Sequence, residues 1–324
     1  WIVTISHFFA NQELSTIKIP NGVLGFLIAN MILFLIVSLI KKFHIFSIIT
    51  TLFLTLIFIF IGKSIYFNQT WPVKNWQFVM CDVGQGDGLV IRDLTGKTLV
   101  VDVGPDGKLM TKCLKKLGIK QIDILLLTHF HLDHVAGLKE VQRNYDIKTV
   151  FTSWIKEPYE ESVRVEEILR PQKVNFLLSG QRIQLGEIKL TCLWPTTKKL
   201  EIESIANNSS LVVLVEINNA SILLTGDVEP AAQELIRDTW QKLHVDVIKI
   251  PHHGSKFQDA SFPKWSSARL ALISVGSENS YGHPSKEAID LYEKSRMKVL
   301  STSSSGSISI FVNKHDQIRY SSTG

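Results

Sequence analysis

Cysteine is scarce in this sequence. Only three of its 324 residues are cysteines, at positions 81, 113 and 192, and none has the Cys-x-x-Cys spacing of a thiolate metal site. This excludes a scaffold held together by several disulfide bonds. We therefore expect Cys81, Cys113 and Cys192 to be small core residues, since nothing in the pattern demands a disulfide bond.

A strong charge imbalance is absent from most of the chain. Of the 35 basic and 30 acidic residues, five lysines and one glutamate lie in residues 1–75, which leaves 30 basic and 29 acidic ones. The formal charge of +5 is therefore concentrated in that first part. Net charge gives no evidence of a nucleic-acid-binding surface in residues 76–324.

Two stretches contain no charged residue, residues 23–40 and 45–62. As helices rising 1.5 Å per residue, each would be about 27 Å long, close to the roughly 30 Å hydrocarbon core of a bilayer. A helical hairpin buried in a soluble protein would normally show a polar face, and a signal peptide would have a cleavage site of small residues. We therefore expect two transmembrane helices within residues 23–62.

The short turn between these helices contains Lys41 and Lys42. The positive-inside rule places such a turn in the cytoplasm, so the chain after residue 62 is expected on the extracytoplasmic side. Residues 1–22 are apolar and aromatic before they turn polar, and are expected to be an interfacial segment or the end of a preceding membrane domain. Residues 63–75 are interpreted as a linker.

Residues 76–324 show strand and helix patterns in alternation. Strands are expected at residues 76–83, 88–93, 98–103, 122–127, 148–153, 174–178, 188–193, 210–217, 221–225, 245–250, 269–275, 298–301, 306–312 and 317–320. Helices are expected at residues 108–118, 135–143, 160–169, 229–242 and 285–296. This order predicts an α+β domain with a core of two sheets and helices on both outer faces.

The strongest chemical signal is Thr-His-Phe-His-Leu-Asp-His at residues 128–134, directly after the apolar run 122–127. That run is expected to be a buried strand, so the polar turn after it lies at the edge of a sheet. Imidazole and carboxylate groups are ligands for zinc, manganese and iron. Because neighbouring residues of an extended backbone face opposite sides, one such segment can serve two adjacent metal ions.

Two later strands also end in polar residues. Residues 221–225 lead to Asp227, and residues 245–250 lead to the pair His252 and His253. Each of these strands therefore delivers candidate ligands at its C-terminal end, as the strand before the histidine cluster does.

This ordered set resembles the metallo-β-lactamase superfamily, in which a histidine-rich motif, a bridging aspartate and a final histidine build a two-metal site on an αββα sandwich. The resemblance assigns the ligands to two metals: His129 and His131 to the first, Asp133, His134 and His253 to the second, and Asp227 to both. It also implies that Asp102 supports the histidine loop from behind, while His252 stands beside the final ligand. The expected fold is this sandwich, preceded by a transmembrane helical hairpin.

The pattern departs from the superfamily in one place. The superfamily has a further histidine ligand before the bridging aspartate, whereas no histidine lies between His134 and His244 here. Residues 207–210, Asn-Asn-Ser-Ser, are the expected replacement. The first metal would then be bound weakly, bound only with substrate, or completed by an amide oxygen, for which Asn208 is the candidate. An oxygen ligand favours a harder ion, so manganese is expected beside zinc.

Five motifs in order narrow the resemblance. They are Asp-Val-Gly-Gln-Gly-Asp at 82–87, the histidine cluster at 128–134, Leu-Thr-Gly-Asp at 224–227, Pro-His-His-Gly-Ser at 251–255 and Tyr-Gly-His-Pro at 281–284. With the two apolar stretches, they resemble the C-terminal region of ComEC-type DNA-internalization competence proteins. The resemblance implies DNA uptake during transformation, in which one strand passes through a membrane channel and this domain degrades the other.

The same resemblance implies partners and a location. The partners are DNA, the membrane-channel remainder of the same or a longer chain, and other proteins of the DNA-uptake machinery. The location is the cell membrane, crossed several times, with the metallo-β-lactamase-like domain on the extracytoplasmic side.

Hydrolysis of a phosphodiester needs a nucleophile and neutralisation of charge at phosphorus, which two divalent metal ions can supply. Asp133 and Asp227 are expected to orient the nucleophile. His283 is expected either to donate a proton to the leaving oxygen or only to hydrogen-bond within its own turn. The other candidates for supporting or substrate-binding roles are Asp82, Asp87, Lys249 and Ser255.

Two alternatives to a nuclease remain open. One is a hydrolase of the same superfamily that acts on a small ester, lactam or thioester. The other is a non-catalytic domain that binds DNA or closes the channel, which the missing histidine would explain.

Overall fold

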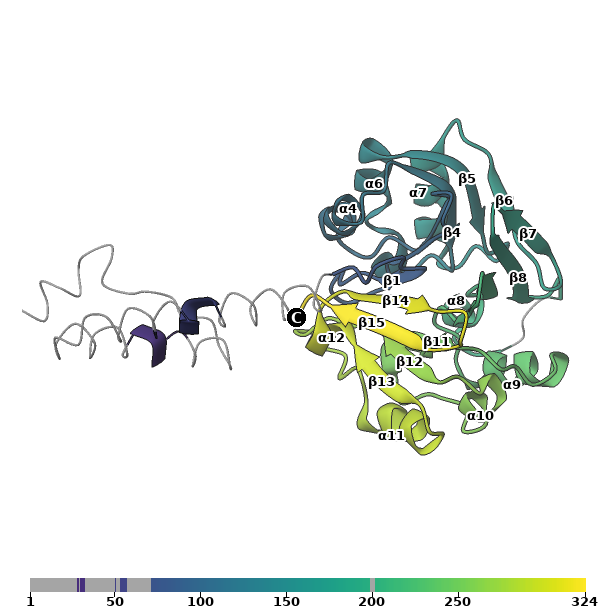
Figure 1. Cartoon of the computed structure of the whole chain (residues 1–324). Helices are drawn as coiled ribbons and strands as arrows, with labels where there is room; N and C mark the ends of the chain where they lie inside the picture. The colour runs from purple at the N-terminus through teal and green to yellow at the C-terminus, as the bar shows by residue number, and fades with distance from the viewer. Residues whose placement is uncertain (1–27, 29, 33–49, 51–52, 57–70, 199–201) are drawn as a thin grey trace, which may run out of the picture. The chain divides into compact units, whose positions relative to one another are not determined.

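The computed structural model describes residues 28, 30–32, 50, 53–56, 71–198 and 202–324 (Figure 1). The chain divides into two compact units, Trp1–Thr70 and Trp71–Gly324. The predicted interfacial segment and most of the two predicted membrane helices and of the predicted linker lie outside the described residues. Within the described residues, no helix is long and apolar enough to cross a membrane.

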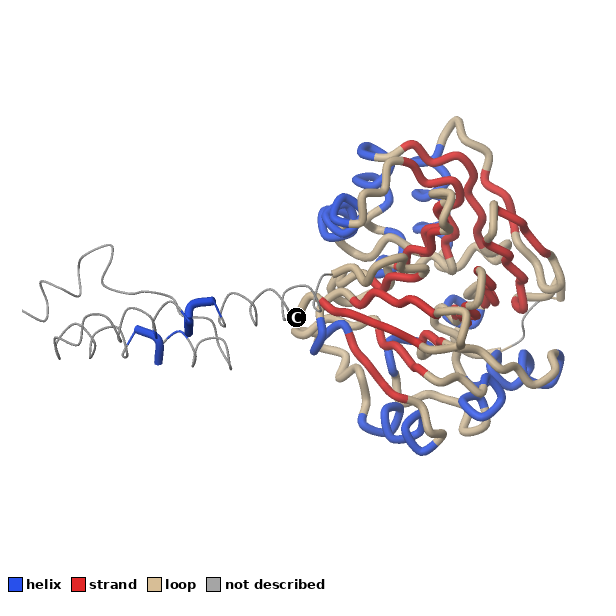
Figure 2. The backbone as a smooth tube through the Cα atoms, in the orientation of Figure 1, coloured by secondary structure: helices blue, strands red, loops and turns tan. Residues whose placement is uncertain are grey.

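Two mixed sheets form the centre of the second unit (Figure 2). The strands of the first sheet, in spatial order, are β15 (Ile318–Ser322), β14 (Ile308–Val312), β1 (Phe78–Met80), β2 (Leu89–Arg92), β3 (Thr98–Val101), β4 (Gln121–Leu127), β5 (Asp146–Thr152) and β6 (Val174–Phe176). Those of the second are β13 (Lys298–Ser301), β12 (Leu270–Ile273), β11 (Val247–Lys249), β10 (Ala220–Leu224), β9 (Val212–Ile217), β8 (Ile188–Trp194) and β7 (Arg182–Leu185).

Each sheet has one parallel part. In the first sheet β3, β4, β5 and β6 run parallel, and in the second β10, β11, β12 and β13 do. The carboxyl ends of parallel strands meet at one edge of a sheet, which is where open α/β sheets bind their ligands. Both sheets therefore have an edge suited to carry a functional site.

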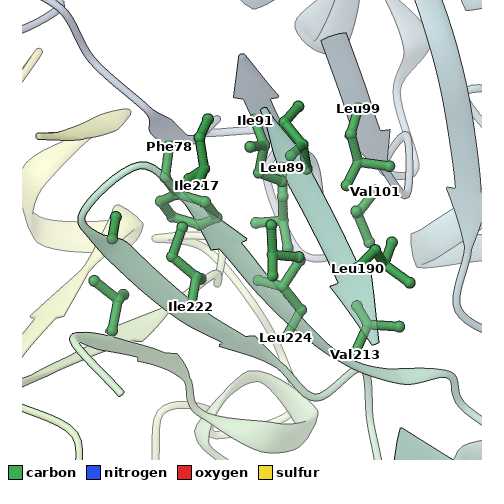
Figure 3. Packing of buried hydrophobic residues seen from close by; sticks show 14 of the residues in the cluster. Phe78, Leu89, Ile91, Leu99, Val101, Leu190, Val213, Ile217, Ile222 and Leu224 are labelled. Atoms are coloured by element: carbon green, nitrogen blue, oxygen red, sulfur yellow. The ribbon is translucent and has the colours of Figure 1, made fainter. Parts of the chain in front are cut away.

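The sheets pack face to face through alternating apolar side chains (Figure 3). On β2, Leu89 and Ile91 enter the core between the sheets, while Val90 between them faces the helices on the other side. This alternation is the period-2 pattern of a strand that is buried on both faces. Residues of the second sheet, such as Ile222 and Leu224 of β10, complete the core from the opposite side (Figure 3).

Helices cover the outer face of each sheet (Figure 2). The first sheet is covered by α4 (Gly107–Lys116), α5 (Leu132–Val135), α6 (Leu138–Asn144) and α7 (Tyr159–Leu169). The second is covered by α9 (Pro230–Thr239), α10 (Phe262–Ser266) and α11 (Lys286–Lys294). The α+β, αββα arrangement predicted from the sequence is therefore confirmed.

Local differences from the prediction have physical reasons. The helix expected at 135–143 is two helices, α5 and α6, because Gly137 packs against the backbone: a Cβ on Gly137 would lie 2.3 Å from Val103 O. Strand β7 was not predicted, and neither were the short helices α8 (Ile205–Asn208), η1 (Pro251–Gly254), α10 and α12 (Thr302–Ser305). Segments this short do not show a hydrophobic period.

The prediction for the cysteines was wrong in one respect. Cys81 and Cys113 are buried, as expected, but they form a disulfide bond with a Cα–Cα distance of 6.0 Å. Cys81 follows β1 and Cys113 lies on α4, so the bond ties the start of the domain to the first helix that covers it. Cys192 is buried and free.

Candidate metal centre

The predicted site residues come together where strands of both sheets end. His129 to His134 follow β4, and Asp102 follows β3 of the same sheet. Asp227 follows β10 of the second sheet, and His253 lies in η1 directly after β11. The arrangement of strand ends expected from the sequence is present.

Four of these side chains converge on one point. The ligand atoms of Asp133, His134, Asp227 and His253 all lie within 4.8 Å of one another. Nε2 of His253 is 3.2 Å from Oδ2 of both Asp133 and Asp227, and Nε2 of His134 is 3.2 Å from the same oxygen of Asp227. Two imidazoles and two carboxylates so placed suit one divalent ion.

The other two histidines form a pair beside this group. Nε2 of His129 lies 3.0 Å from Nδ1 of His131. The remaining nitrogen of His129, Nδ1, lies 3.1 Å from Oγ of Ser210 and 3.2 Å from Oγ1 of Thr128, which occupy it. Burial holds the pKa of His129 well below its usual value, so this imidazole is neutral and able to bind a metal.

Hydrogen bonds behind the ligands fix which ring nitrogen faces the centre. Nδ1 of His134 lies 2.8 Å from Oδ2 of Asp102, and Nδ1 of His253 lies 2.8 Å from the carbonyl oxygen of Ser274. Both partners accept a hydrogen, so Nδ1 is the protonated nitrogen and Nε2 is turned to the centre. Thr128 anchors Asp102 in turn, by donating its N–H at 2.8 Å and its hydroxyl at 2.7 Å.

The charges also fit a cation. Burial alone would lower the pKa values of His134 and His253, but the surrounding carboxylates outweigh it and raise both well above the usual value. In the same way the imidazoles lower the pKa of Asp227 against the effect of burial. The carboxylates thus face protonated imidazoles. A divalent ion would take the place of the protons on the ring nitrogens that face the centre.

Lys249 and Asp87 form a buried ion pair next to the cluster. Nζ of Lys249 lies 2.5 Å from Oδ2 of Asp87 and 3.2 Å from Oδ1 of Asp227, and it donates to the carbonyl oxygen of Gly226 at 2.7 Å. The Lys249 side chain has no solvent exposure. The expected contact of Lys249 with a substrate phosphate is therefore corrected: Lys249 is a counter-ion inside the protein.

The glycine-rich loop at residues 82–87 is a support and not an open phosphate cradle. A Cβ on Gly86 would lie 2.0 Å from the carbonyl oxygen of Asp133, and the N–H of Asp87 donates to that oxygen at 3.3 Å. Asp82 is exposed and its Oδ1 accepts the N–H of Gly84. The loop thus packs against the backbone of a candidate ligand.

A cleft of about 570 Å³ opens onto the centre. Its lining residues are Gln85, Pro105, His131, Leu132, Asp133, Pro158, Glu161, Asn207, Asp227, His252, His253, Tyr281 and His283. Of the remaining candidates, Ser255 is buried and accepts the N–H of Phe257, so it does not face the cleft.

His283 lies in the cleft, as the sequence suggested. Burial and the neighbouring charges of His252 and His253 lower the pKa of His283 to about 4, and its Nδ1 is buried without a hydrogen-bond partner among the described residues. A neutral imidazole of this pKa suits a hydrogen bond to a ligand better than the predicted donation of a proton near neutral pH.

The prediction that Asn208 replaces the missing histidine as a ligand is corrected. The Asn208 amide is fully used, because Oδ1 accepts the N–H of Glu229 at 2.8 Å and Nδ2 donates to the carbonyl oxygen of Glu203 at 2.8 Å. Its neighbour Asn207 lines the cleft instead. Asn207 belonged to the segment singled out in the sequence, whereas no sequence signal pointed to Glu229.

Comparison with protein families gives one match to this region. The family described as the metallo-beta-lactamase superfamily matches residues 81–277. The range includes all six candidate metal ligands but not His283.

One of the curated relatives is named as a competence protein. ComE operon protein 3 of Bacillus subtilis is 29% identical over 261 residues, which cover 71% of this chain and 32% of that protein. Competence protein ComA of Neisseria gonorrhoeae is 26% identical over 254 residues, which cover 76% of this chain and 34% of that protein. The chain thus spans about a third of the length of these relatives. The resemblance to ComEC-type competence proteins is confirmed.

Solved structures of low sequence identity superimpose on part of the chain. The metallo-beta-lactamase fold protein YhfI from Bacillus subtilis superimposes with a TM-score of 0.47 and 13% identity, over 69% of this chain and 95% of that one.

Proposed function

Because this chain belongs to the metallo-beta-lactamase superfamily, we propose that its cleft is the active site of a divalent-metal-dependent phosphodiesterase that hydrolyses DNA. In this proposal the chain is the nuclease region of a DNA-uptake channel and degrades the strand that is not transported. One of the relatives is named as a competence protein, and this name supports a role in DNA uptake.

The observation that carries the proposal is the convergence of ligand atoms at the floor of an open cleft. Asp133, His134, Asp227 and His253 supply four atoms within 4.8 Å, and the paired nitrogens of His129 and His131 adjoin them. When bound, two divalent ions at such a centre neutralise the charge on a phosphodiester and lower the pKa of water.

The protein's own residues would orient the reactants. The carboxylate of Asp133 is 31% exposed and faces the cleft, so it can accept a hydrogen bond from the attacking water. The buried Asp227 is held by Lys249 at one oxygen and keeps the other for the centre. His283 would hydrogen-bond to an oxygen of the substrate through its free ring nitrogen.

The disulfide bond supports the proposed side of the membrane. Disulfide bonds form and persist in oxidising compartments and are rare in the reducing cytosol. A bond between Cys81 and Cys113 therefore agrees with an extracytoplasmic position of residues 71–324, in a protein anchored by the uncharged stretches 23–40 and 45–62. The remaining partners in the proposal are DNA, the channel part of the same or a longer chain, and other DNA-uptake proteins.

The test uses the purified chain, stripped of metal and assayed on single-stranded and double-stranded DNA with manganese, zinc or magnesium restored. We expect cleavage by the wild type with at least one ion. Asp227→Asn should abolish it, because Oδ2 of Asp227 lies 3.2 Å from the imidazoles of both His134 and His253 in the ligand group. Cleavage at the wild-type rate by Asp227→Asn would show that a contaminating nuclease, or a different site, is responsible.

A second set of substrates separates the proposal from its closest rival. If no ion restores DNA cleavage but the wild type hydrolyses a small ester or lactam, the substrate class is wrong while the metal hydrolase remains. If the wild type binds DNA without cleaving any substrate, the domain is a binding module and the proposal fails.

A further inference from the structure

The pair His129 and His131 is an incomplete metal site. Their facing nitrogens, 3.0 Å apart, supply two ligands, and Asp227 lines the same cleft as His131. Among the described residues, no group of three or more His, Cys, Asp or Glu ligand atoms within 4.8 Å of one another includes His129 or His131. An ion at this position therefore needs a ligand of another kind.

We propose that the side-chain oxygen of Asn207 is that ligand, and that Glu229 is the positioning residue that turns it toward the ion. The inference rests on the proposed function only in requiring a metal centre, and it specifies how the first half of that centre is completed.

The hydrogen bonds of Asn207 define the orientation of its amide. Nδ2 donates to Oε1 of Glu229 at 2.8 Å. A carboxylate can only accept, so the nitrogen must face Glu229 and the oxygen must lie on the other branch of the planar group. This oxygen is buried, and it has no hydrogen-bond partner among the described residues. Asn207 lines the cleft together with His131 and Asp227.

A buried amide oxygen without a partner is costly. Leaving such an acceptor unsatisfied loses the hydrogen bonds it would make to water, and native proteins rarely tolerate it without a reason. A cation in the cleft would satisfy it directly. Asn208 has no such unsatisfied oxygen, because its amide makes hydrogen bonds through both of its branches.

Glu229 is itself fixed from two further directions. Its N–H donates to Oδ1 of Asn208 at 2.8 Å, and its Oε1 lies 3.4 Å from Nδ1 of His252. The hydrogen bond from Asn207 and the contact with His252 thus meet at the same carboxylate oxygen, Oε1. The segment that replaces the missing histidine thus presents one amide oxygen and uses the next amide to hold Glu229.

Ser210 is the other candidate in this segment, and its contacts exclude it. Its hydroxyl lies 3.1 Å from Nδ1 of His129, whereas the nitrogen of His129 that faces His131 is Nε2. The same hydroxyl accepts the N–H of Asp227 at 3.0 Å. Ser210 therefore supports two ligands from behind.

The ligand set has a consequence for metal preference. A neutral amide oxygen is a harder and weaker ligand than an imidazole nitrogen. The first site should therefore bind more weakly than the second, which has two carboxylates, and should discriminate less against manganese than a site with three histidines.

The test measures metal binding in the absence of nucleic acid. The metal-free chain is titrated with Mn²⁺ by calorimetry, and bound Mn²⁺ is followed by electron paramagnetic resonance. We expect two sites of unequal affinity in the wild type. Asn207→Ala should weaken one of them by at least about 10-fold, in the range seen when the groups around metal ligands are removed, and should leave the other unchanged.

Three further variants locate the effect. His131→Ala should abolish binding at the site that Asn207→Ala weakens. His253→Ala should abolish binding at the other site. Glu229→Gln should weaken the first site by less than Asn207→Ala, because a glutamine can still accept from Asn207 but no longer fixes its orientation. Glu234→Gln, at an exposed glutamate on helix α9, which begins directly after Glu229, is the matched control and should bind both ions as the wild type does.

Two Mn²⁺ ions bound to Asn207→Ala with wild-type affinities would overturn the proposal, and so would a wild type that binds one ion whose affinity Asn207→Ala leaves unchanged. Asn207→His is a second variant that does not depend on removing a side chain. It should raise the affinity of the first site for Zn²⁺ above that of the wild type, and an unchanged Zn²⁺ affinity would count against Asn207. Because no substrate is present, failure of the nuclease assay leaves these outcomes unaffected.

Discussion

Nζ of Lys249 lies 3.2 Å from Oδ1 of Asp227, while Oδ2 of the same carboxylate faces the imidazoles of His134 and His253. One oxygen of Asp227 is thus held by a buried ammonium group and the other is directed to the metal centre. The second partner of Lys249, Asp87, lies 2.5 Å away and has no other cation as close in the described part of the chain. Lys249 is therefore the counter-ion that these two buried carboxylates share.

Replacing Lys249 should strongly destabilise the protein. Lys249→Met keeps the apolar stem but leaves Asp87 and Asp227 without their counter-ion, which typically costs about 3–5 kcal/mol for a buried pair. Denaturant unfolding of the metal-free chain measures the loss, with the exposed Lys120→Met as control. Adding Asp87→Asn to Lys249→Met should recover part of it. Equal unfolding free energies for Lys249→Met and Lys120→Met would contradict this account.

Metal binding should release protons and strengthen with pH. The carboxylates around His134 and His253 raise the pKa values of both imidazoles in the metal-free protein, so both carry a proton at neutral pH. Each proton must leave before the ring nitrogen can bind an ion. Calorimetric titrations near pH 7 in buffers of different ionisation enthalpy should therefore differ in apparent binding enthalpy. Identical enthalpies in all buffers would mean that the histidines are already neutral.

Asp93 should contribute to the loss of stability in acid. Its carboxylate accepts four hydrogen bonds, from Glu187 N, Lys97 N and both the N–H and the hydroxyl of Thr95. Burial alone would raise the pKa of Asp93, but these bonds outweigh it and lower the pKa below 3.8. A lowered folded-state pKa stabilises the protein above the unfolded value, and the effect is lost as the pH falls toward the folded value.

Asp93→Asn tests this contribution. An amide has only one accepting oxygen, so some of the groups that donate to Asp93 would lose their acceptor. We therefore expect Asp93→Asn to lower the free energy of unfolding by about 1–3 kcal/mol at pH 7. The difference between wild type and variant should begin to shrink when unfolding is measured below about pH 4, because protonation of Asp93 in the unfolded chain then favours unfolding. A difference that stays constant from pH 7 to pH 3 would show that the charge of Asp93 has no role.

The disulfide bond should contribute to stability in oxidising conditions only. Cys81 and Cys113 are 32 positions apart, and breaking a native disulfide bond typically costs about 2–5 kcal/mol. Cys113→Ser should therefore unfold at lower denaturant concentration than the oxidised wild type. A reducing agent should lower the stability of the wild type toward that of Cys113→Ser and leave the variant unchanged. An unchanged wild type after full reduction would contradict the prediction.

The sequence predicted the parts of this molecule that depend on local patterns. Apolar strands such as residues 122–127 are identifiable because both of their faces are buried, and the polar residues that follow them must lie at a sheet edge. This rule points to residues 129–134, Asp227 and the pair His252 and His253 as candidates, and only the resemblance to the superfamily assigned the metal ligands among them. The edge strand Arg182–Leu185 was missed because two of its four residues are exposed and polar.

Features that depend on the orientation of a single side chain were not predictable. Asn207 and Asn208 are neighbours, and only their positions on the short helix α8 decide that Asn207 lines the cleft while Oδ1 of Asn208 accepts the backbone N–H of Glu229. The disulfide bond likewise depends on α4 packing over the end of β1. Glu229 carries no signal, because a glutamate before a proline at a helix start is ordinary.

The ligands of the metal centre come from segments far apart in the sequence. Asp133 and His253, whose side chains meet at 3.2 Å, are 120 positions apart, and β1 pairs with β14 more than two hundred residues later. During synthesis, the histidine cluster leaves the ribosome long before the residues that complete its ion site or close its sheet. An ion held by both Asp133 and His253 could therefore bind only after the chain has been synthesised beyond β11.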